Sequence, residues 1–397
     1  FRTGAIAHTV VAGLSFTSEN FELNSLNLFR NADGSNPFAA PNHLPFMDIN
    51  NPDNLYTGPI NPTLTGKTDG ELDNRAIYLF DTMELTPQWL LTLGARQEEN
   101  EGSSIISTVS AASNNIGQIT GAGAHLRNDD SLFSYRAGLV YKLNEQVSLY
   151  LSHGNSKTPS KASVNGSCVQ TVNNVAGTNN CNVDAETARS SELGMKWASH
   201  DGKLALTTAI FRNDRSNYRV ADPDPSNLSG EQALDGQARV DGVLVGLAGL
   251  LNERWSVYAN YSYLHSEILQ GASDYLSGLG QDYAKGDPLM QTPDHSFNVW
   301  TTYDLVPGRW QIGAGSTFQD EFALAQHSAA LQNGPLPYSD SYWTHRAMLA
   351  YTVNRALSLQ LNVNNLTDEE YYTRIRNNGW ATPGDTRAYT LTANWRL

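Results

Sequence analysis

The chain has 397 residues and a formal net charge of −14, from 40 acidic and 26 basic side chains. This acidic balance argues against a nucleic-acid partner, because phosphates need a basic surface. Mean hydropathy is −0.41, and no run approaches the roughly 18 apolar residues that a membrane helix needs. A membrane β-barrel has a similar composition, since only alternate residues face lipid. The period of the hydrophobic pattern therefore decides the class.

Strict alternation of apolar and polar residues recurs from the first twenty residues to the last ten. In 255–263 the odd positions are Trp, Val, Ala, Tyr and Tyr, and the even ones are Ser, Tyr, Asn and Ser. A period of two places the two sets on opposite faces of a strand. The chain then divides into about fourteen predicted strands: 4–20, 75–86, 89–101, 131–143, 147–156, 188–199, 203–219, 236–250, 254–269, 294–306, 309–321, 342–353, 356–366 and 387–397.

The connections between these strands alternate between short and long. Six are turns of a few residues, such as Pro307 to Gly308. The seven long connections cover roughly 21–74, 102–130, 157–187, 220–235, 270–293, 322–341 and 367–386. Outer-membrane barrels have short periplasmic turns and long extracellular loops. The sequence therefore predicts an all-β fold in one domain, 1–397: a transmembrane antiparallel β-barrel with extracellular loops and a periplasmic C-terminus. A soluble β-sandwich or propeller is the alternative.

Two cysteines, Cys168 and Cys181, lie in one Ser-, Asn- and Gly-rich connection. Cysteines so close in a polar loop predict a disulfide in an oxidising compartment. A pair of unlinked thiols is the alternative.

Five segments, in this order along the chain, carry a resemblance to a known family: GAIAHTVVAG at 4–13, AIYLFDTMEL at 76–85, RAGLVYK at 136–142, SELGMK at 191–196 and NVNNLTD at 362–368, the last followed by PGDTR at 383–387. The chain resembles TonB-dependent outer-membrane receptors, and among them the receptors for ferric siderophores of the catecholate type. The ordered set covers nearly the whole chain, whereas each segment alone is weak.

The resemblance implies a barrel of 22 strands filled by an N-terminal plug that carries the TonB-contacting box. The fourteen predicted strands would be the last fourteen of that barrel. We therefore expect this chain to be a C-terminal fragment, without the plug, the box and about eight strands. The chain ends in Leu397, where the family usually ends in Phe.

Capture of a bulky, anionic and aromatic ferric siderophore suits Arg and Lys for charge, and Tyr and Trp for stacking. We expect the strongest ligand contacts in loop 367–386, and weaker candidates near the mouth of the barrel. Structural roles, such as interface aromatics or contacts with lipopolysaccharide, are the alternative for each of them. The candidates are Tyr371, Tyr372, Arg374, Arg376 and Trp380 in that loop, and His327, Tyr338, Tyr283, Lys285, Arg127 and Arg219 elsewhere.

We expect no cofactor or metal site, so that iron would be carried only as part of the siderophore. The partners implied are the TonB complex, reached through the N-terminal region, and outer-membrane lipid or lipopolysaccharide, with a monomeric receptor. Arg96 and Arg136 are predicted on the polar face deeper in the barrel, paired with carboxylates of the plug or wall. An enzyme is not expected, because no nucleophile and base are clustered. Two alternatives stay open: a passive 14-stranded porin, and the same family with haem, cobalamin or a sugar as cargo.

Overall fold

A computed structural model describes residues 1–37, 56, 58–159, 185–221, 232–375 and 380–396. Fifteen strands form one sheet in chain order, and each pairs antiparallel with the next. They are β1 (Arg2–Thr3), β2 (Ile6–Asn27), β3 (Thr63–Glu84), β4 (Trp89–Val109), β5 (Ile119–Lys142), β6 (Val147–Thr158), β7 (Glu186–Ala198), β8 (Leu204–Ala221), β9 (Gln232–Asn252), β10 (Trp255–Gln270), β11 (His295–Val306), β12 (Trp310–Gln319), β13 (Tyr342–Thr352), β14 (Leu357–Asn364) and β17 (Ala388–Trp395). A short helix, α1 (Asp274–Gly278), and a hairpin of β15 (Tyr372–Ile375) and β16 (Ala381–Pro383) stand outside the sheet.

All fourteen predicted strands are present, which confirms the antiparallel all-β class. The predicted loop 102–130 is wrong, because β4 continues to Val109 and β5 begins at Ile119. The predicted loop 21–74 is also too long, since β2 continues to Asn27 and β3 begins at Thr63. The ladder continues through this polar stretch, with Lys67 of β3 opposite Ser107 of β4. Both faces of these strand extensions are rich in polar residues. The alternation of apolar and polar residues is therefore lost, although the strands remain paired through their backbones.

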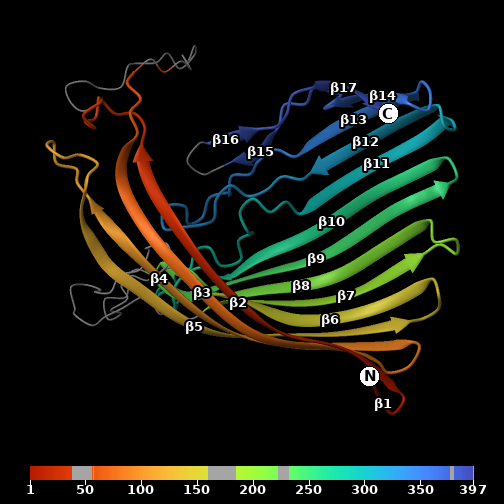
Figure 1. The fold of residues 1–397 in the computed structure, drawn as a ribbon, viewed down its shortest axis with the longest axis horizontal. Coiled ribbons are helices and arrows are strands. Elements are labelled where there is room, and N and C mark those ends of the chain that lie inside the picture. Colours follow the sequence, from red (N-terminus) through yellow and green to blue (C-terminus); the bar gives the residue numbers. More distant parts are fainter. Residues whose placement is uncertain (38–55, 57, 160–184, 222–231, 376–379, 397) are drawn as a thin grey trace.

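The short turns lie at one end of the sheet, together with both chain termini, and the long connections lie at the other end (Figure 1). Side chains that accept backbone hydrogen bonds stabilise the turns. Asn144 accepts from the amides of Gln146 and Val147 at 2.9 and 2.8 Å. Asn354 accepts from those of Ala356 and Leu357 at 2.8 and 3.0 Å. Asn favours this local bonding, which explains why strands reverse here in so few residues.

The convex face of the sheet carries an apolar band between two rows of aromatic side chains. Near the short turns, Trp310 stacks on Tyr351 with ring centroids 4.2 Å apart. Eight residues further along β12, Phe318 packs on Trp343 with ring centroids 4.8 Å apart. Eight residues of a tilted strand rise roughly 20 Å, close to the height of the lipid-facing band of an outer-membrane barrel. The convex face therefore suits hydrocarbon between these rows.

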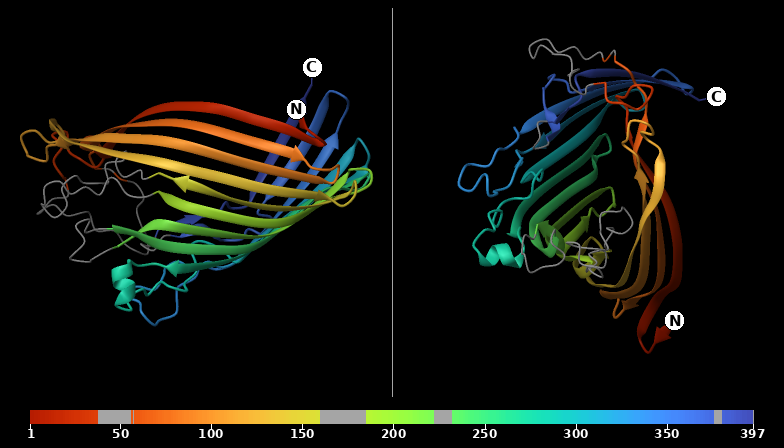
Figure 2. Two further views of the ribbon diagram at one scale, coloured as in Figure 1. Left: turned by 90° about the horizontal axis from the view of Figure 1, so that it is seen from below. Right: turned by 90° about the vertical axis from the view of Figure 1, so that its left-hand side faces the viewer.

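The sheet is curled but not closed (Figure 2). In the described part of the chain, β2 pairs with β1 and β3 and β17 pairs with β14, and no pairing joins β2 to β17. The concave face is thus the inner wall of an incomplete barrel. Within the same residues, no helix is both long and apolar enough to cross a membrane.

Candidate ligand-binding site

The β15–β16 hairpin stands above the last strands of the sheet and carries most of the residues predicted to bind a ligand. Its base is held by Tyr371, whose ring packs on Tyr342 at 4.4 Å between centroids. The amide of Gly384 donates to the carbonyl of Tyr371 at 2.7 Å. A side chain at Gly384 would collide with the Tyr371 ring. Tyr371 therefore holds the base of the hairpin in place, and its contact with a ligand stays a prediction.

The other described side chains of the hairpin face solvent, except that of the half-buried Ile375. Tyr372 is 52% exposed and Trp380 is 72% exposed, and Arg374 is also exposed. Arg376 lies outside the described residues. The hairpin thus offers two aromatic rings and a guanidinium, which can stack on aromatic groups and pair with anionic oxygens.

The NVNNLTD segment forms the support of this hairpin. The side-chain amide of Asn365 donates to the carbonyls of Glu369 and Asp385 at 2.9 and 3.0 Å. Arg387 pairs with Asp368 at 3.1 Å, and Asp368 also accepts from the Arg387 amide at 3.0 Å. Asn365 and Asp368 have φ angles of 47° and 60°, a conformation that Asn and Asp adopt more readily than most residues. Hydrogen bonds of Asn365 and the ion pair of Asp368 with Arg387 thus join the NVNNLTD and PGDTR segments at the base of the hairpin.

His327 joins the two connections that follow β10 and β12. Its Nδ1 lies 2.7 Å from a carboxylate oxygen of Asp287, and its Nε2 lies 3.0 Å from the carbonyl oxygen of Gly334. The His327 amide donates to the second Asp287 oxygen at 2.6 Å. Both ring nitrogens face acceptors, so the doubly protonated imidazolium fits best. The Asp287 hydrogen bond, followed by the Gly334 carbonyl, raises the pKa of His327 from its ordinary 6.5.

We expect this contact between the two connections to weaken at alkaline pH. Because the folded-state pKa lies above the unfolded one, the stabilisation is complete below about pH 6.5 and is lost as pH rises through the raised value. An NMR titration of the His327 ring should give a midpoint above 6.5, and Asp287→Asn should lower it. His327→Gln identifies the resonance. A midpoint at or below 6.5 in the unaltered protein contradicts the imidazolium contact.

Tyr338 lies in an acidic hollow of about 320 Å³ whose wall includes Asp294, Asp320 and Glu321. Burial, followed by the charges of Asp294 and Glu321, raises the pKa of the Tyr338 hydroxyl. These carboxylates would repel an anionic ligand. In the connection after β10, Lys285 is exposed and Tyr283 is half-buried.

The remaining candidates are spread over the structure. Arg127 lies within β5, opposite Ser103, between the buried neighbours Leu126 and Asn128. It therefore lies on the convex face, on the opposite side of the sheet from Arg136. Arg219 lies near the end of β8 and is half-buried. Cys168 and Cys181 lie outside the described residues.

The inner wall carries a repeated pairing that sequence reasoning missed. Aromatic rings lie over glycines directly opposite them on the next strand: Tyr78 over Gly13, Phe80 over Gly94, Tyr150 over Gly194, Phe211 over Gly242 and Trp300 over Gly315. A basic side chain covers four of these rings at 5.0–5.7 Å from the centroid: Arg96 on Tyr78, Arg136 on Phe80, Lys196 on Tyr150 and Arg346 on Trp300. Because glycine has no side chain, each ring can lie flat against the strand. The cation–π contact then holds the basic group over the ring.

These stacks confirm that Arg96 and Arg136 lie on the polar face. Arg96 also forms an ion pair with Glu98, a carboxylate of the wall on the same strand. The pairing of these arginines with carboxylates of a plug stays a prediction. Charged side chains are unevenly distributed over the inner wall. From β3 to β7 it carries charged side chains. On β9, β10 and β12, the described side chains at concave-face positions include no Asp, Glu, Lys or Arg.

Comparison with known proteins identifies the fold and its relatives. Residues 6–366 match the family model "TonB dependent receptor-like, beta-barrel". The probable TonB-dependent siderophore receptor PiuA of Acinetobacter baumannii is 32% identical over 83% of this chain, and the catecholate siderophore receptor Fiu of Escherichia coli K12 is 29% identical over 99% of it. The crystal structures of the Fiu closed form and of PiuA each superpose with a TM-score of 0.80, at 27% identity over 100% of this chain.

The chain spans less than half the length of these two curated relatives, 41% of PiuA and 49% of Fiu. It covers 53% and 54% of the corresponding crystallised chains. The open edges of the sheet agree with a match to only part of a barrel.

Proposed function

The chain belongs to the TonB-dependent receptor family, in its β-barrel part, and from this we propose that it forms the wall and part of the mouth of an outer-membrane receptor importing a ferric siderophore, of the catecholate type. The family consists of receptors and transporters, which supports a transport role over an enzymatic one. With the long connections outside the cell, the β15–β16 hairpin stands at the entrance. TonB and lipopolysaccharide are the proposed protein and lipid partners.

The exposed face of the hairpin is the observation that carries the proposal. Tyr372, Arg374 and Trp380 combine aromatic rings with a fixed positive charge on an element raised above the wall. A ferric catecholate is an aromatic anion, so it complements both features. The names of the relatives Fiu and PiuA, which refer to catecholate and siderophore receptors, support the same cargo class.

The open sheet weighs against a passive 14-stranded pore. Such a pore would need β17 to pair with β2, and these strands are unpaired with each other in the described residues. In hydrocarbon, unpaired backbone groups cost several kcal/mol each, so an open wall needs further strands to close it. A conductance measurement separates the two: a stable open channel formed by this stretch alone would favour the pore.

Growth under iron limitation tests the cargo. A strain deleted for this receptor and complemented with its gene should grow on a ferric catecholate and not on ferric hydroxamates or haem as the iron source. The empty plasmid is the control. Growth restored by haem, and not by a catecholate, would contradict the proposed cargo while leaving the family unchanged.

A further inference from the structure

Two short segments connect the β15–β16 hairpin to the sheet. The first stalk, residues 365–371, follows β14, and the second stalk, residues 384–387, precedes β17. The two stalks are bonded to each other at three levels: Asn365 to Asp385, Asp368 to Arg387, and Tyr371 to Gly384. The hairpin therefore stands on one joined support and not on two independent lengths of chain.

The first stalk is also attached to the neighbouring strand β13. The Leu366 amide donates to the carbonyl of His345 at 2.7 Å, which continues the pairing of β14 with β13 beyond the end of β14. Further from the membrane band, the Tyr371 ring packs on that of Tyr342, the first residue of β13. These contacts set the direction in which the hairpin leaves the wall.

Asn365 lies at the base of the stalks and is 5% exposed, whereas residues 366–370 are exposed. Its side-chain amide donates to the carbonyls of Glu369 and Asp385 at 2.9 and 3.0 Å. Its side-chain oxygen accepts from the Glu369 amide at 2.8 Å. Both donors and the acceptor of the amide are thus in use. A carboxylate of the same shape cannot donate, so it would leave both carbonyls without this partner.

The ligand-facing side chains of the hairpin depend on this support. Tyr372, Arg374 and Trp380 are exposed, so the stalks decide where these groups point. A ligand that must first order a loose hairpin loses part of its binding energy to that ordering. Its apparent dissociation constant rises in inverse proportion to the fraction of hairpins that are correctly placed.

We infer that Asn365 is a positioning residue for ligand capture. It holds the two stalks together, so that the hairpin presents its aromatic and basic side chains in one direction before a ligand arrives. Asn365 acts through the hairpin and does not itself meet the ligand, because it is buried beneath it. The inference rests on the proposed function and adds to it how the entrance is kept ready for binding.

Asn365→Asp tests the inference in the receptor as the cell produces it, because it removes both donors and keeps the shape of the side chain. The probe is radioactive iron in a tris-catecholate complex. Binding is measured on de-energised cells and uptake on energised ones, at equal amounts of receptor in the membrane. We expect the affinity to fall about tenfold, with maximal uptake at saturating complex changed less than about twofold.

Asn364→Asp is the matched control, because it adds the same charge one position earlier, at an exposed side chain. We expect it to change the affinity less than about twofold, since an exposed charge is screened by salt. Equal losses in the two variants would assign the effect to repulsion of an anionic ligand and overturn the inference.

The side chains of the hairpin provide a second comparison. In a receptor that already carries Arg374→Ala and Trp380→Ala, Asn365→Asp should lower the remaining affinity by less than about twofold, because a positioning residue acts only through the groups that it positions. The same tenfold loss in that background would show general damage to the receptor and contradict the inference.

Hydrogen exchange follows the position of the hairpin without any ligand. Amides of β15 and β16 should exchange faster in Asn365→Asp than in the unaltered receptor, while those of β13 and β14 keep their rates. Equal exchange of the hairpin in both proteins would overturn the inference. Failure of the unaltered receptor to bind the complex would instead remove the proposed function, and the exchange result would still decide whether Asn365 holds the hairpin.

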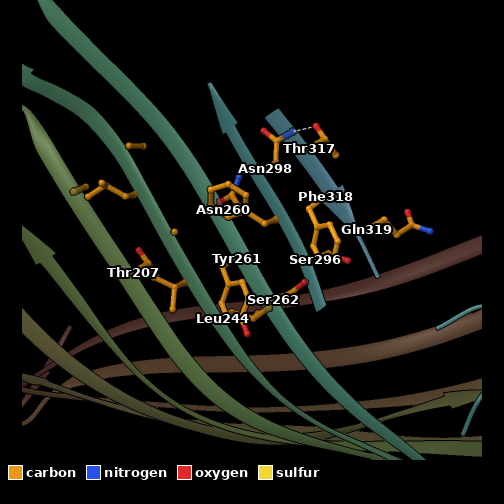
Figure 3. A pocket seen from close by; sticks show the side chains of 16 residues that line it. Thr207, Leu244, Asn260, Tyr261, Ser262, Ser296, Asn298, Thr317, Phe318 and Gln319 are labelled. Atoms are coloured by element: carbon orange, nitrogen blue, oxygen red, sulfur yellow. Dashed lines mark hydrogen bonds between the residues drawn. The ribbon is translucent and has the colours of Figure 1, made fainter. Parts of the chain in front are cut away.

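Asp368→Asn covers the possibility that Asn365→Asp does not fold, because it weakens only the exposed pair with Arg387. We expect it to lower the affinity about threefold and to speed exchange of the hairpin in the same way. A ligand held chiefly on the concave wall, where a hollow of about 550 Å³ lies between β8 and β12 (Figure 3), would not depend on the direction of the hairpin. Unchanged affinity in Asn365→Asp, or in Asp368→Asn if the first variant does not fold, would therefore overturn the inference.

Discussion

Gly315→Ala is expected to lower the free energy of unfolding of the barrel wall by about 1–3 kcal/mol, the usual cost of overpacking. A Cβ atom at this position would lie 2.6 Å from the Trp300 ring, 2.6 Å from the Val299 carbonyl oxygen and 2.9 Å from the Arg346 Nε atom. The ring can turn, but the carbonyl belongs to the paired strand and cannot move without disturbing the ladder. Because Arg346 lies over Trp300, the displacement would also disturb the cation on the inner wall.

The measurement is urea-induced unfolding of the receptor in lipid or detergent, followed by tryptophan fluorescence. Gly138→Ala is the matched control, because its nearest neighbour would be a backbone oxygen at 3.9 Å; we expect a change below about 0.5 kcal/mol there. Equal effects at Gly315 and Gly138 would show that the ring-over-glycine contact is not what stabilises this wall.

Removing both the charge and the ring from the hairpin, as Arg374→Ala with Trp380→Ala, is expected to weaken binding of a ferric catecholate by about 10–100-fold. Side chains of these two types dominate binding energies where they meet a partner, and each contributes about 0.7–1.4 kcal/mol at a partly exposed site. Both are on the described, solvent-facing part of the hairpin, so their removal leaves no unfilled core.

Fluorescence quenching or radioactive iron binding on intact cells gives the affinity. Arg355→Ala, an exposed arginine in the short turn between β13 and β14, is the control and should leave it unchanged. Tyr371→Ala should also weaken binding, but through loss of the hairpin's position, and limited proteolysis of the hairpin distinguishes the two causes. Unchanged affinity in the double variant would place the ligand elsewhere.

Most of the fold could be predicted from the sequence because the membrane imposes a simple rule on it. In the band between the aromatic rows, one face meets lipid and the other the lumen, so alternation in segments such as 255–263 is unambiguous. Beyond the lipid-facing band, both faces of a strand can be polar, so the alternation of apolar and polar residues no longer marks it. The stretch from Ile119 to Asp130 is mostly small or polar on both faces, and it reads as a loop although its backbone pairs with β4.

Less of the site could be predicted. Residue types identified the cluster in 367–386, but they could not tell that Tyr371 is a support while Trp380 is exposed. The sequence offers His327 as a candidate ligand contact, but it gives no sign that the residue bonds to Asp287, which lies 40 positions away. The ring-over-glycine pairs depend on which residues stand opposite each other on neighbouring strands, and that register is a property of the assembled sheet.

The unequal strand lengths give the rim of the barrel a lopsided profile. β2, β3, β4 and β5 have 21–24 residues, whereas β12 and β13 have 10 and 11. These four strands are therefore longer than β12 and β13 by roughly 35–45 Å along their own direction. In the proposed orientation, with the long connections outside the cell, these four strands project furthest from the membrane. We therefore expect a ligand to reach the hairpin from the side of the shorter strands β12 and β13.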